Sequence, residues 1–334
     1  MSRISIVIPL YNKAPFVQRT LESIASQTYT DWECIIVNDG STDKSADVVR
    51  DVICNMENGI GEKFHLIEQG NAGVSAARNL GISVSDRESD FVCFLDADDW
   101  WAPIFLEEMV KLTEQYPKAG VFACNYYKVK NGKLISFFDQ PTGSADYFKM
   151  YQTIAMPITS ISVMVRRDVL ESVAEKDADG NRVYFKPNLK LGEDFDLWIR
   201  LCMKSQFVWC NEHLAYYNND VPVNARAIGN LHHPKHHILW NLEDIEERLA
   251  MSDERTRESY KCMIDTIRVY SLMPYYLSND YRKDAIEQLR KVDWTKQPMK
   301  YRLQYKMPIW LLKVKNRFMR MGSFYKQKLL KIIR

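Results

Sequence analysis

Three carboxylates stand close together in DFVCFLDADDW, residues 90–100, directly after an apolar run. Asp96, Asp98 and Asp99 would repel one another, and carboxylates at the edge of a core lose hydration. A divalent cation, Mn²⁺ or Mg²⁺, would relieve the repulsion, with a phosphate-bearing ligand completing its coordination. Alternatively, Asp98 or Asp99 caps a helix that begins near Pro103, although a cap needs only one carboxylate. The pattern favours a metal site at Asp96 and Asp98.

A second group of carboxylates lies in GEDFDLWIRL, residues 192–201. Helical spacing places Asp194 on the same face as Trp198 and Leu201. A carboxylate at the start of a buried stripe is either a cap or a reactive group that faces a cleft. Beside a nucleotide and metal site, Asp194 becomes a candidate general base.

Two further stretches contain residue types that can bind a phosphate or a metal. In NAGVSAARN, residues 71–79, small residues lead into a helix whose N-terminus attracts negative charge. Arg78 could reach a phosphate there, and the alternative is an ordinary surface arginine. In HHPKHH, residues 232–237, Pro234 interrupts any helical ligand face, so we interpret these histidines as exposed residues at a helix start.

The first half of the chain alternates apolar strands with amphipathic helices, which predicts a parallel sheet covered by helices on both faces. We expect helices to start at Pro15 and at an N-cap formed by Ser41 or Thr42. The expected strands cover residues 4–10, 33–39, 63–69 and 90–96. In such sheets ligands bind beyond the carboxyl ends of the strands. Polar residues stand at three of these ends: Tyr11 and Asn12; Asn38, Asp39 and Gly40; Asp96 and Asp98.

After residue 120 the alternation of strands and helices becomes less regular. A hairpin is expected around Asn131-Gly132, followed by a strand in SISVMVRR and a helix in the segment that contains Asp194. From about residue 232 onward the chain reads as mostly helical. We therefore expect a catalytic domain over 1–220, a helical extension over 221–298 and a basic amphipathic segment over 299–334.

Charge and cysteine content limit the binding partners and the cellular location that we expect for the protein. The 334 residues carry a net charge of only +2, which argues against a nucleic-acid-binding protein. Residues 299–334 hold eleven Lys or Arg and no Asp or Glu, so the first 298 residues carry −9. The seven cysteines form no CxxC pair, and no apolar stretch approaches the ~20 residues that span a bilayer. We expect a cytoplasmic protein that uses its basic tail either on the cytoplasmic face of an anionic membrane or against its own acidic body.

Five motifs in this order resemble family 2 glycosyltransferases of the GT-A fold, of the bacterial surface-polysaccharide type. They are SIVIPLYN, QTYTDWECIIVNDGSTD, NAGVSAARNLGI, FLDADDW and GEDFDLWIRL. The resemblance covers about residues 1–220. It implies a Rossmann-like, mostly parallel sheet flanked by helices, to which a helical C-terminal extension is added.

The resemblance also implies roles for individual residues around a nucleotide-sugar donor, usually a UDP-sugar. These are Pro9, Tyr11 and Asn12 in the nucleoside pocket, Asp39 at the uracil, Gly73 and Arg78 near the nucleoside and diphosphate, Asp96 at the ribose or metal, Asp98 on the metal, and Asp194 as base. A diphosphate contact after the Asp194 helix has only Asn224 and Arg226 as weak candidates.

The expected reaction is an inverting transfer of a hexosyl or N-acetylhexosaminyl group to a hydroxyl of a glycan or lipid-linked acceptor. A catalytically inactive relative that only binds sugar nucleotides is the main alternative. A nucleotidyltransferase is a weaker one, because its glycine-rich phosphate loop would follow the first strand. The corresponding segment here, PLYNKAPF, contains no glycine.

Overall fold

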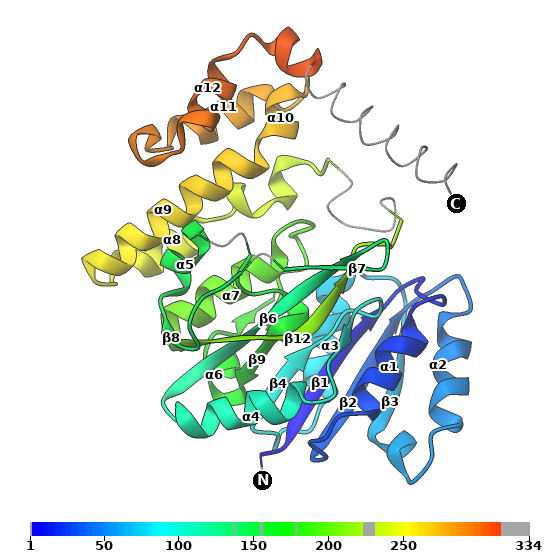
Figure 1. The fold of residues 1–334 in the computed structure, drawn as a ribbon. Coiled ribbons are helices and arrows are strands. Elements are labelled where there is room, and N and C mark those ends of the chain that lie inside the picture. The colour runs from blue at the N-terminus through cyan, green and yellow to red at the C-terminus, as the bar shows by residue number, and fades with distance from the viewer. Residues whose placement is uncertain (1, 137, 154–155, 178, 223–230, 315–334) are drawn as a thin grey trace. The chain divides into compact units, whose positions relative to one another are not determined.

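A computed structural model describes residues 2–136, 138–153, 156–177, 179–222 and 231–314 (Figure 1). The chain forms two compact units, Met1–Met251 and Ser252–Arg334. Among the described residues no helix is both long and apolar enough to cross a bilayer.

One mixed sheet forms the centre of the first unit, with strand order β3-β2-β1-β4-β9-β6-β12-β5. Strand β7 pairs with β6, and β8 pairs with β12. The strands are β1 (Ile4–Leu10), β2 (Trp32–Asp39), β3 (Phe64–Gln69), β4 (Phe91–Phe94), β5 (Trp100–Trp101), β6 (Ala119–Lys130), β7 (Lys133–Ile135), β8 (Gly143–Ala145), β9 (Val163–Arg166) and β12 (Gln206–Asn218).

The expected parallel arrangement is confirmed for the first four strands. Their apolar runs are continuous because helices cover both faces; every residue of β2 is buried. Strand β9 runs antiparallel between β4 and β6, and β6 pairs in parallel with β12. The hairpin expected at Asn131-Gly132 connects β6 to β7, and both residues have positive φ, 50° and 70°.

Helices flank this sheet (Figure 1). They are α1 (Val17–Ala25), α2 (Ser45–Cys54), α3 (Val74–Val84), α4 (Phe105–Gln115), α5 (Tyr147–Thr153), α6 (Arg167–Ser172), α7 (Glu193–Lys204) and α8 (Glu243–Ala250). A short hairpin, β10 (Glu175–Lys176) and β11 (Arg182–Val183), precedes α7.

Two expected helix starts are wrong by a few residues. Helix α1 begins at Val17 rather than Pro15, and α2 begins at Ser45 with Lys44 in the N-cap position. Ser41 does not cap α2, because its hydroxyl accepts the backbone N–H of Asn12 instead. The carboxylate of Asp43 accepts the backbone N–H of Ser45, the first residue of α2, at 2.9 Å.

Helices make up the second unit. They are α9 (Glu254–Ser271), α10 (Met273–Leu277), α11 (Arg282–Arg290) and α12 (Met299–Lys306). Its core includes Met263 and Ile264 of α9 and Leu289 of α11. An aspartate of α9, Asp265, pairs with Arg268 and accepts the backbone N–H of Asp293, which ties α9 to the segment after α11.

Candidate active site

The carboxylates of the DADD segment follow the carboxyl end of β4, where the ends of β1 and β2 also lie. Asp99 is 2% exposed, and its Oδ1 accepts the backbone N–H of Asn218, the last residue of β12, at 2.6 Å. Helix α4 begins only at Phe105, and its N-cap residue makes no side-chain cap bond. The capping alternative for Asp98 and Asp99 is therefore wrong.

Two cations lie against the two remaining carboxylates. Nζ of Lys13 lies 2.5 Å from Oδ2 of Asp98, and Nη2 of Arg78 lies 2.8 Å from Oδ1 of Asp96. Burial nevertheless raises the pKa of Asp98, against the opposing effect of Lys13, and the charge of Asp96 raises it further. Burial also raises the pKa of Asp99 far above its usual range, and the Asp98 charge adds to the effect. This edge of the sheet still favours additional positive charge.

The donor set suits a divalent metal only in part. Asp96 and Asp98 are partly exposed, and both offer the oxygen ligands that Mg²⁺ and Mn²⁺ take. Among the described residues, no three His, Cys, Asp or Glu side chains are placed to hold a metal by themselves. The protein thus offers two carboxylates, and the remaining ligands would come from a bound diphosphate and water. With diphosphate and water as the further ligands, the residues present suit a divalent metal ion.

Arg78 of α3 connects the two carboxylate groups across the site. Its side chain is 4% exposed, and Nη1 lies 3.2 Å from Oε1 of Glu193, the first residue of α7. Because Nη2 pairs with Asp96, one buried guanidinium bridges the end of β4 and the start of α7. The surface-arginine alternative is wrong. A contact of Arg78 with a phosphate stays a prediction, and its buried Nε has no hydrogen-bond partner among the described residues.

Asp39 shapes the loop that precedes α3. Its Oδ1 accepts the backbone N–H of Ala72 at 2.7 Å and the Nε2–H of Gln69 at 2.6 Å. Its Oδ2 accepts the N–H of Gly73 at 2.9 Å. Gly73 has a φ of 95°, which favours glycine, and it stands in the N-cap position of α3. Asp39 thus fixes the helix N-terminus where an anion is expected, and its bond to uracil stays a prediction.

The residues after β1 lie at the same carboxyl edge of the sheet. Asn12 has a φ of 52°, and its side-chain oxygen accepts the backbone N–H of Thr42 at 2.8 Å, which ties the first loop to the second. Tyr11 is 43% exposed, as a surface that stacks on a base requires, and Pro9 is half-buried. Their nucleoside contacts stay predictions. Asn224 and Arg226 lie outside the described residues.

Asp194 stands in the first turn of α7. Gly192 with φ 87° is the N-cap residue, so Asp194 is not the N-cap. Its Oδ1 accepts the backbone N–H of Phe195 at 2.8 Å. Burial raises the pKa of Asp194 to about 7, the charge of Glu193 adds to the effect, and Arg78 opposes it. A carboxylate with a pKa near neutrality can both accept and release a proton under physiological conditions.

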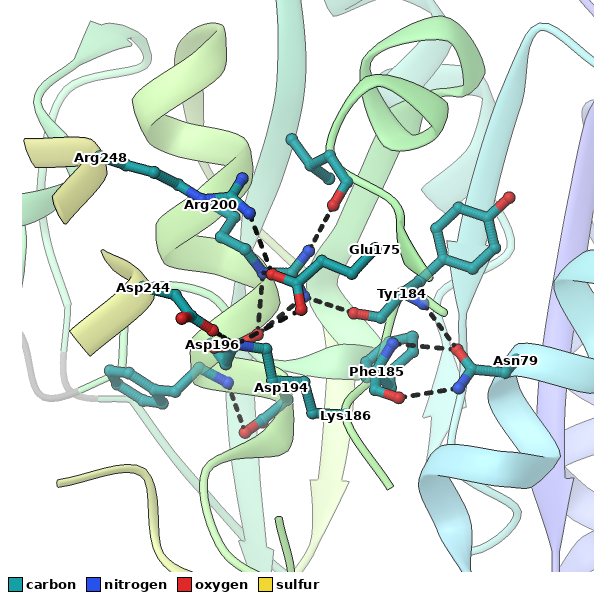
Figure 2. A network of polar contacts seen from close by, with 12 residues as sticks. Asn79, Glu175, Tyr184, Phe185, Lys186, Asp194, Asp196, Arg200, Asp244 and Arg248 are labelled. Carbon is teal, nitrogen blue, oxygen red and sulfur yellow. Dashed lines mark hydrogen bonds and ion pairs between the residues drawn. The ribbon is translucent and has the colours of Figure 1, made fainter. Parts of the chain in front are cut away.

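A buried ion pair fixes the helix that carries Asp194 (Figure 2). Arg200 lies one turn after Asp196 on α7, and both side chains are fully buried, 2.7 Å apart. The same guanidinium donates to the carbonyl oxygens of Val173 at 2.7 Å and Tyr184 at 2.5 Å. Arg200 therefore attaches α7 to the end of α6 and to the segment after β11.

The segment after β11 is also attached to α3. The side-chain oxygen of Asn79 accepts the N–H groups of Tyr184 and Phe185 at 3.1 and 2.9 Å. Its Nδ2 donates to the carbonyl of Phe185 at 2.7 Å (Figure 2). Residues 184–186 thereby connect the helix of Arg78 with the helix of Asp194. Lys186 extends the connection, with Nζ 3.3 Å from Asp196 and 3.0 Å from Asp244 of α8.

A large cavity lies away from this site. Its volume is about 1140 Å³, and it lies where β4 begins and β9 ends, between residues such as Ser89, Asp90 and Arg167. Ligands of open α/β sheets bind at the opposite, carboxyl ends of the parallel strands. None of the predicted site residues lines this cavity, so its size does not make it the active site.

Sequence reasoning missed two partners of the site. Lys13 was unremarkable in PLYNKAPF, although a lysine shortly after the first strand is well placed to meet acids that follow the fourth. Glu193 likewise gives no sign in the sequence that its side chain pairs with Arg78. Neither pairing has a local sequence signal, since the partners lie 85 and 115 residues apart.

Comparison with known proteins supports the family and the fold that the sequence motifs resemble. The family model described as Glycosyl transferase family 2 matches residues 5–174, just over half of the chain. Glycosyltransferase GlyA of Streptococcus pneumoniae is 33% identical over 154 residues, which are 46% of this chain and 21% of GlyA. EpsH of Bacillus subtilis is 36% identical over 123 residues, which are 37% of this chain and 33% of EpsH. The matched part is thus a fifth to a third of each relative's length.

A solved structure extends the likeness in fold. The crystal structure of S. aureus TarS 1-349 in complex with UDP-GlcNAc is similar with a TM-score of 0.69 and 16% sequence identity. The similarity covers 86% of this chain and 79% of the TarS chain. At this identity the likeness concerns the fold, and it confirms the expected GT-A architecture.

The buried pair on α7 leads to a stability prediction. We expect Arg200→Met to lower the free energy of unfolding by ~3–5 kcal/mol, because the carboxylate of Asp196 then stays buried without its main partner. Arg248→Met is the matched control: this arginine is 43% exposed and pairs with Glu175, so its loss should cost ~1 kcal/mol or less. Chemical denaturation followed by tryptophan fluorescence measures both, since six of the eight tryptophans precede residue 252. Equal losses in the two variants would contradict the role given to the buried pair.

The raised pKa of Asp194 leads to a second prediction. Its folded pKa of about 7 lies above the unfolded value of roughly 3.9. Ionisation therefore costs the folded state free energy; the cost is absent below pH ~4 and complete above pH ~7. We expect Asp194→Asn to be more stable than the wild type by up to ~4 kcal/mol at pH 8 and nearly equal to it at pH 4.

Denaturation at the two pH values tests this expectation, with the exposed Asp51→Asn as control. A stability difference that does not change between pH 4 and pH 8 would show that Asp194 ionises as freely in the folded chain as in the unfolded one.

Proposed function

The chain belongs to glycosyl transferase family 2, and from that premise we propose that it transfers a sugar from a nucleotide-diphosphate donor, a UDP-sugar, to a hydroxyl group with inversion of the anomeric configuration. The acceptor we propose is a glycan or a lipid-linked oligosaccharide of bacterial surface-polysaccharide assembly. The transferred group is a hexosyl or N-acetylhexosaminyl group. TarS has been crystallised with UDP-GlcNAc, which makes that donor a first choice for screening.

The observation that carries the proposal is the bridge made by Arg78. Asp96, on the donor side, and Glu193, next to Asp194, are held by the same buried guanidinium. A proton acceptor with a pKa of about 7 is thus fixed beside the carboxylates expected to meet the donor diphosphate. An inverting transfer needs such an arrangement, because the acceptor oxygen must lie between its base and the anomeric carbon.

The reaction then needs a single displacement. A carboxylate oxygen of Asp194 takes the proton of the acceptor hydroxyl, and the acceptor oxygen forms a bond to the anomeric carbon. The bond between that carbon and the diphosphate oxygen breaks, and its electron pair leaves with UDP. Attack from the face opposite the diphosphate inverts the configuration, and no covalent enzyme intermediate forms.

Charge on the departing diphosphate must be neutralised. The N-terminus of α3, which Asp39 holds through the N–H of Gly73, contributes a partial positive charge. Asp96 and Asp98 would hold Mn²⁺ or Mg²⁺, which when bound acts as a Lewis acid toward the diphosphate. Lys13 would have to release Asp98 for both carboxylate oxygens to become ligands, and its ammonium could then contact the diphosphate.

Screening nucleotide sugars for the release of free nucleotide tests the proposal. With wild-type protein and Mn²⁺ we expect turnover of one donor, most readily a UDP-sugar, and loss of turnover in EDTA. Asp194→Asn should reduce turnover by ~10²-fold or more while calorimetry still detects UDP binding. The wild-type rate should fall as the pH drops below 7, because the base becomes protonated.

Two outcomes would contradict this account in different ways. UDP binding without turnover of any donor would favour the inactive relative that binds sugar nucleotides. Loss of UDP affinity together with activity in Asp194→Asn would make Asp194 structural and place the base elsewhere.

A further inference from the structure

The last described part of the second unit, residues 299–314, combines exposed apolar side chains with positive charge. Twelve large apolar side chains of the described residues are exposed, and four of them lie in these sixteen residues. They are Met299 at 71%, Leu303 at 59%, Trp310 at 67% and Val314 at 42%. The same stretch holds four Lys or Arg and no Asp or Glu. This concentration needs a partner of matching chemistry.

Helix α12 directs one face inward and leaves the other uncovered. Tyr301 and Tyr305, one turn apart, contact rings of the unit, and the Tyr305 hydroxyl donates to the carbonyl of Val269 at 2.9 Å. At about 100° per residue, Met299 and Leu303 fall on the opposite side of the helix. Lys306 lies beside them, exposed.

The helical residues after Pro308 repeat this arrangement. Leu312 is 1% exposed and turns into the unit. Trp310 and Val314 are one turn apart on the other side, and Lys313 stands next to Val314, exposed. Each helical segment therefore presents an apolar pair flanked by lysine, and each is held to the unit by its other face.

We propose that residues 299–314 dock the protein on the surface of an anionic lipid bilayer. Apolar side chains of this size enter the boundary between headgroups and acyl chains, and tryptophan prefers that boundary. Lysines beside them meet anionic headgroups, and their long stems reach the interface. We refer to these residues as the docking face.

Charge argues for lipid over two other candidates, the C-terminal residues of this chain and a second copy of the same face. The remaining residues of the chain, 315–334, carry seven Lys or Arg and no Asp or Glu, so they would repel a basic face. A second copy of the same face would repel it for the same reason. Anionic headgroups satisfy both requirements, because they offer negative charge beside an apolar layer.

Flotation of the full chain with vesicles tests the docking face. We expect binding to 70:30 phosphatidylcholine–phosphatidylglycerol vesicles in 50 mM salt, with little binding to pure phosphatidylcholine or in 500 mM salt. Leu303→Ser combined with Trp310→Ser should lose at least tenfold in affinity. Lys300→Gln, Lys306→Gln and Lys313→Gln together should lose about a hundredfold, roughly fivefold for each lysine. Met251→Ser and Val84→Ser, which alter exposed apolar residues elsewhere, are the matched controls.

Quenching gives a second readout. Lipids brominated on their acyl chains should quench part of the tryptophan fluorescence, and Trp310→Phe should remove that part while the protein still floats. The proposal is overturned if the wild type ignores anionic vesicles or if the variants of the docking face float as the wild type does. It is also overturned if chromatography shows that these substitutions abolish self-association instead. A melting temperature equal to the wild type's shows that a variant is folded.

Discussion

The repulsion among five carboxylates at one edge of the sheet is the constraint on which the rest of the site depends. Asp96, Asp98 and Asp99 follow β4, and Glu193 and Asp194 begin α7. Only Lys13 and Arg78 lie against them as cations within the described part of the site. Burial raises the pKa of Asp98, Asp99 and Asp194, and neighbouring negative charges add to the effect, so this edge favours a further cation. Such a site lowers the stability of the folded chain, and it is useful to an enzyme that binds metal and diphosphate.

Holding these charges together requires rigid support, which the first unit provides away from the ligands. Arg200 attaches α7 to two neighbouring segments, and Asn79 attaches α3 to one of the same segments. The helix with the expected phosphate contact and the helix with the expected base are therefore parts of one hydrogen-bonded body. A general base must be placed within a fraction of an ångström, so this support is as necessary as the base itself.

Local patterns were enough to predict the part of the fold that forms the site. Apolar runs without alternation indicated the parallel strands, and polar residues after Leu10, Val37 and Leu95 indicated the edge at which ligands are expected to bind. The insertion of β9 between β4 and β6 could not be predicted, because strand order depends on long-range packing. The pairs Lys13–Asp98 and Arg78–Glu193 could not be predicted either, because they also depend on long-range packing. The N-cap expected at Ser41 or Thr42 is wrong, because both hydroxyls form tertiary hydrogen bonds with Asn12.

Binding of Mn²⁺, measured by the loss of its free electron paramagnetic resonance signal, tests most directly whether this edge of the sheet is a metal and diphosphate site. The account predicts that UDP raises Mn²⁺ affinity strongly, to one ion per chain, because two carboxylates alone make an incomplete set of ligands. Asp98→Ala should abolish this UDP-dependent binding, and the exposed Asp51→Asn should leave it unchanged. Mn²⁺ binding that ignores UDP, or that survives in Asp98→Ala, would contradict the account.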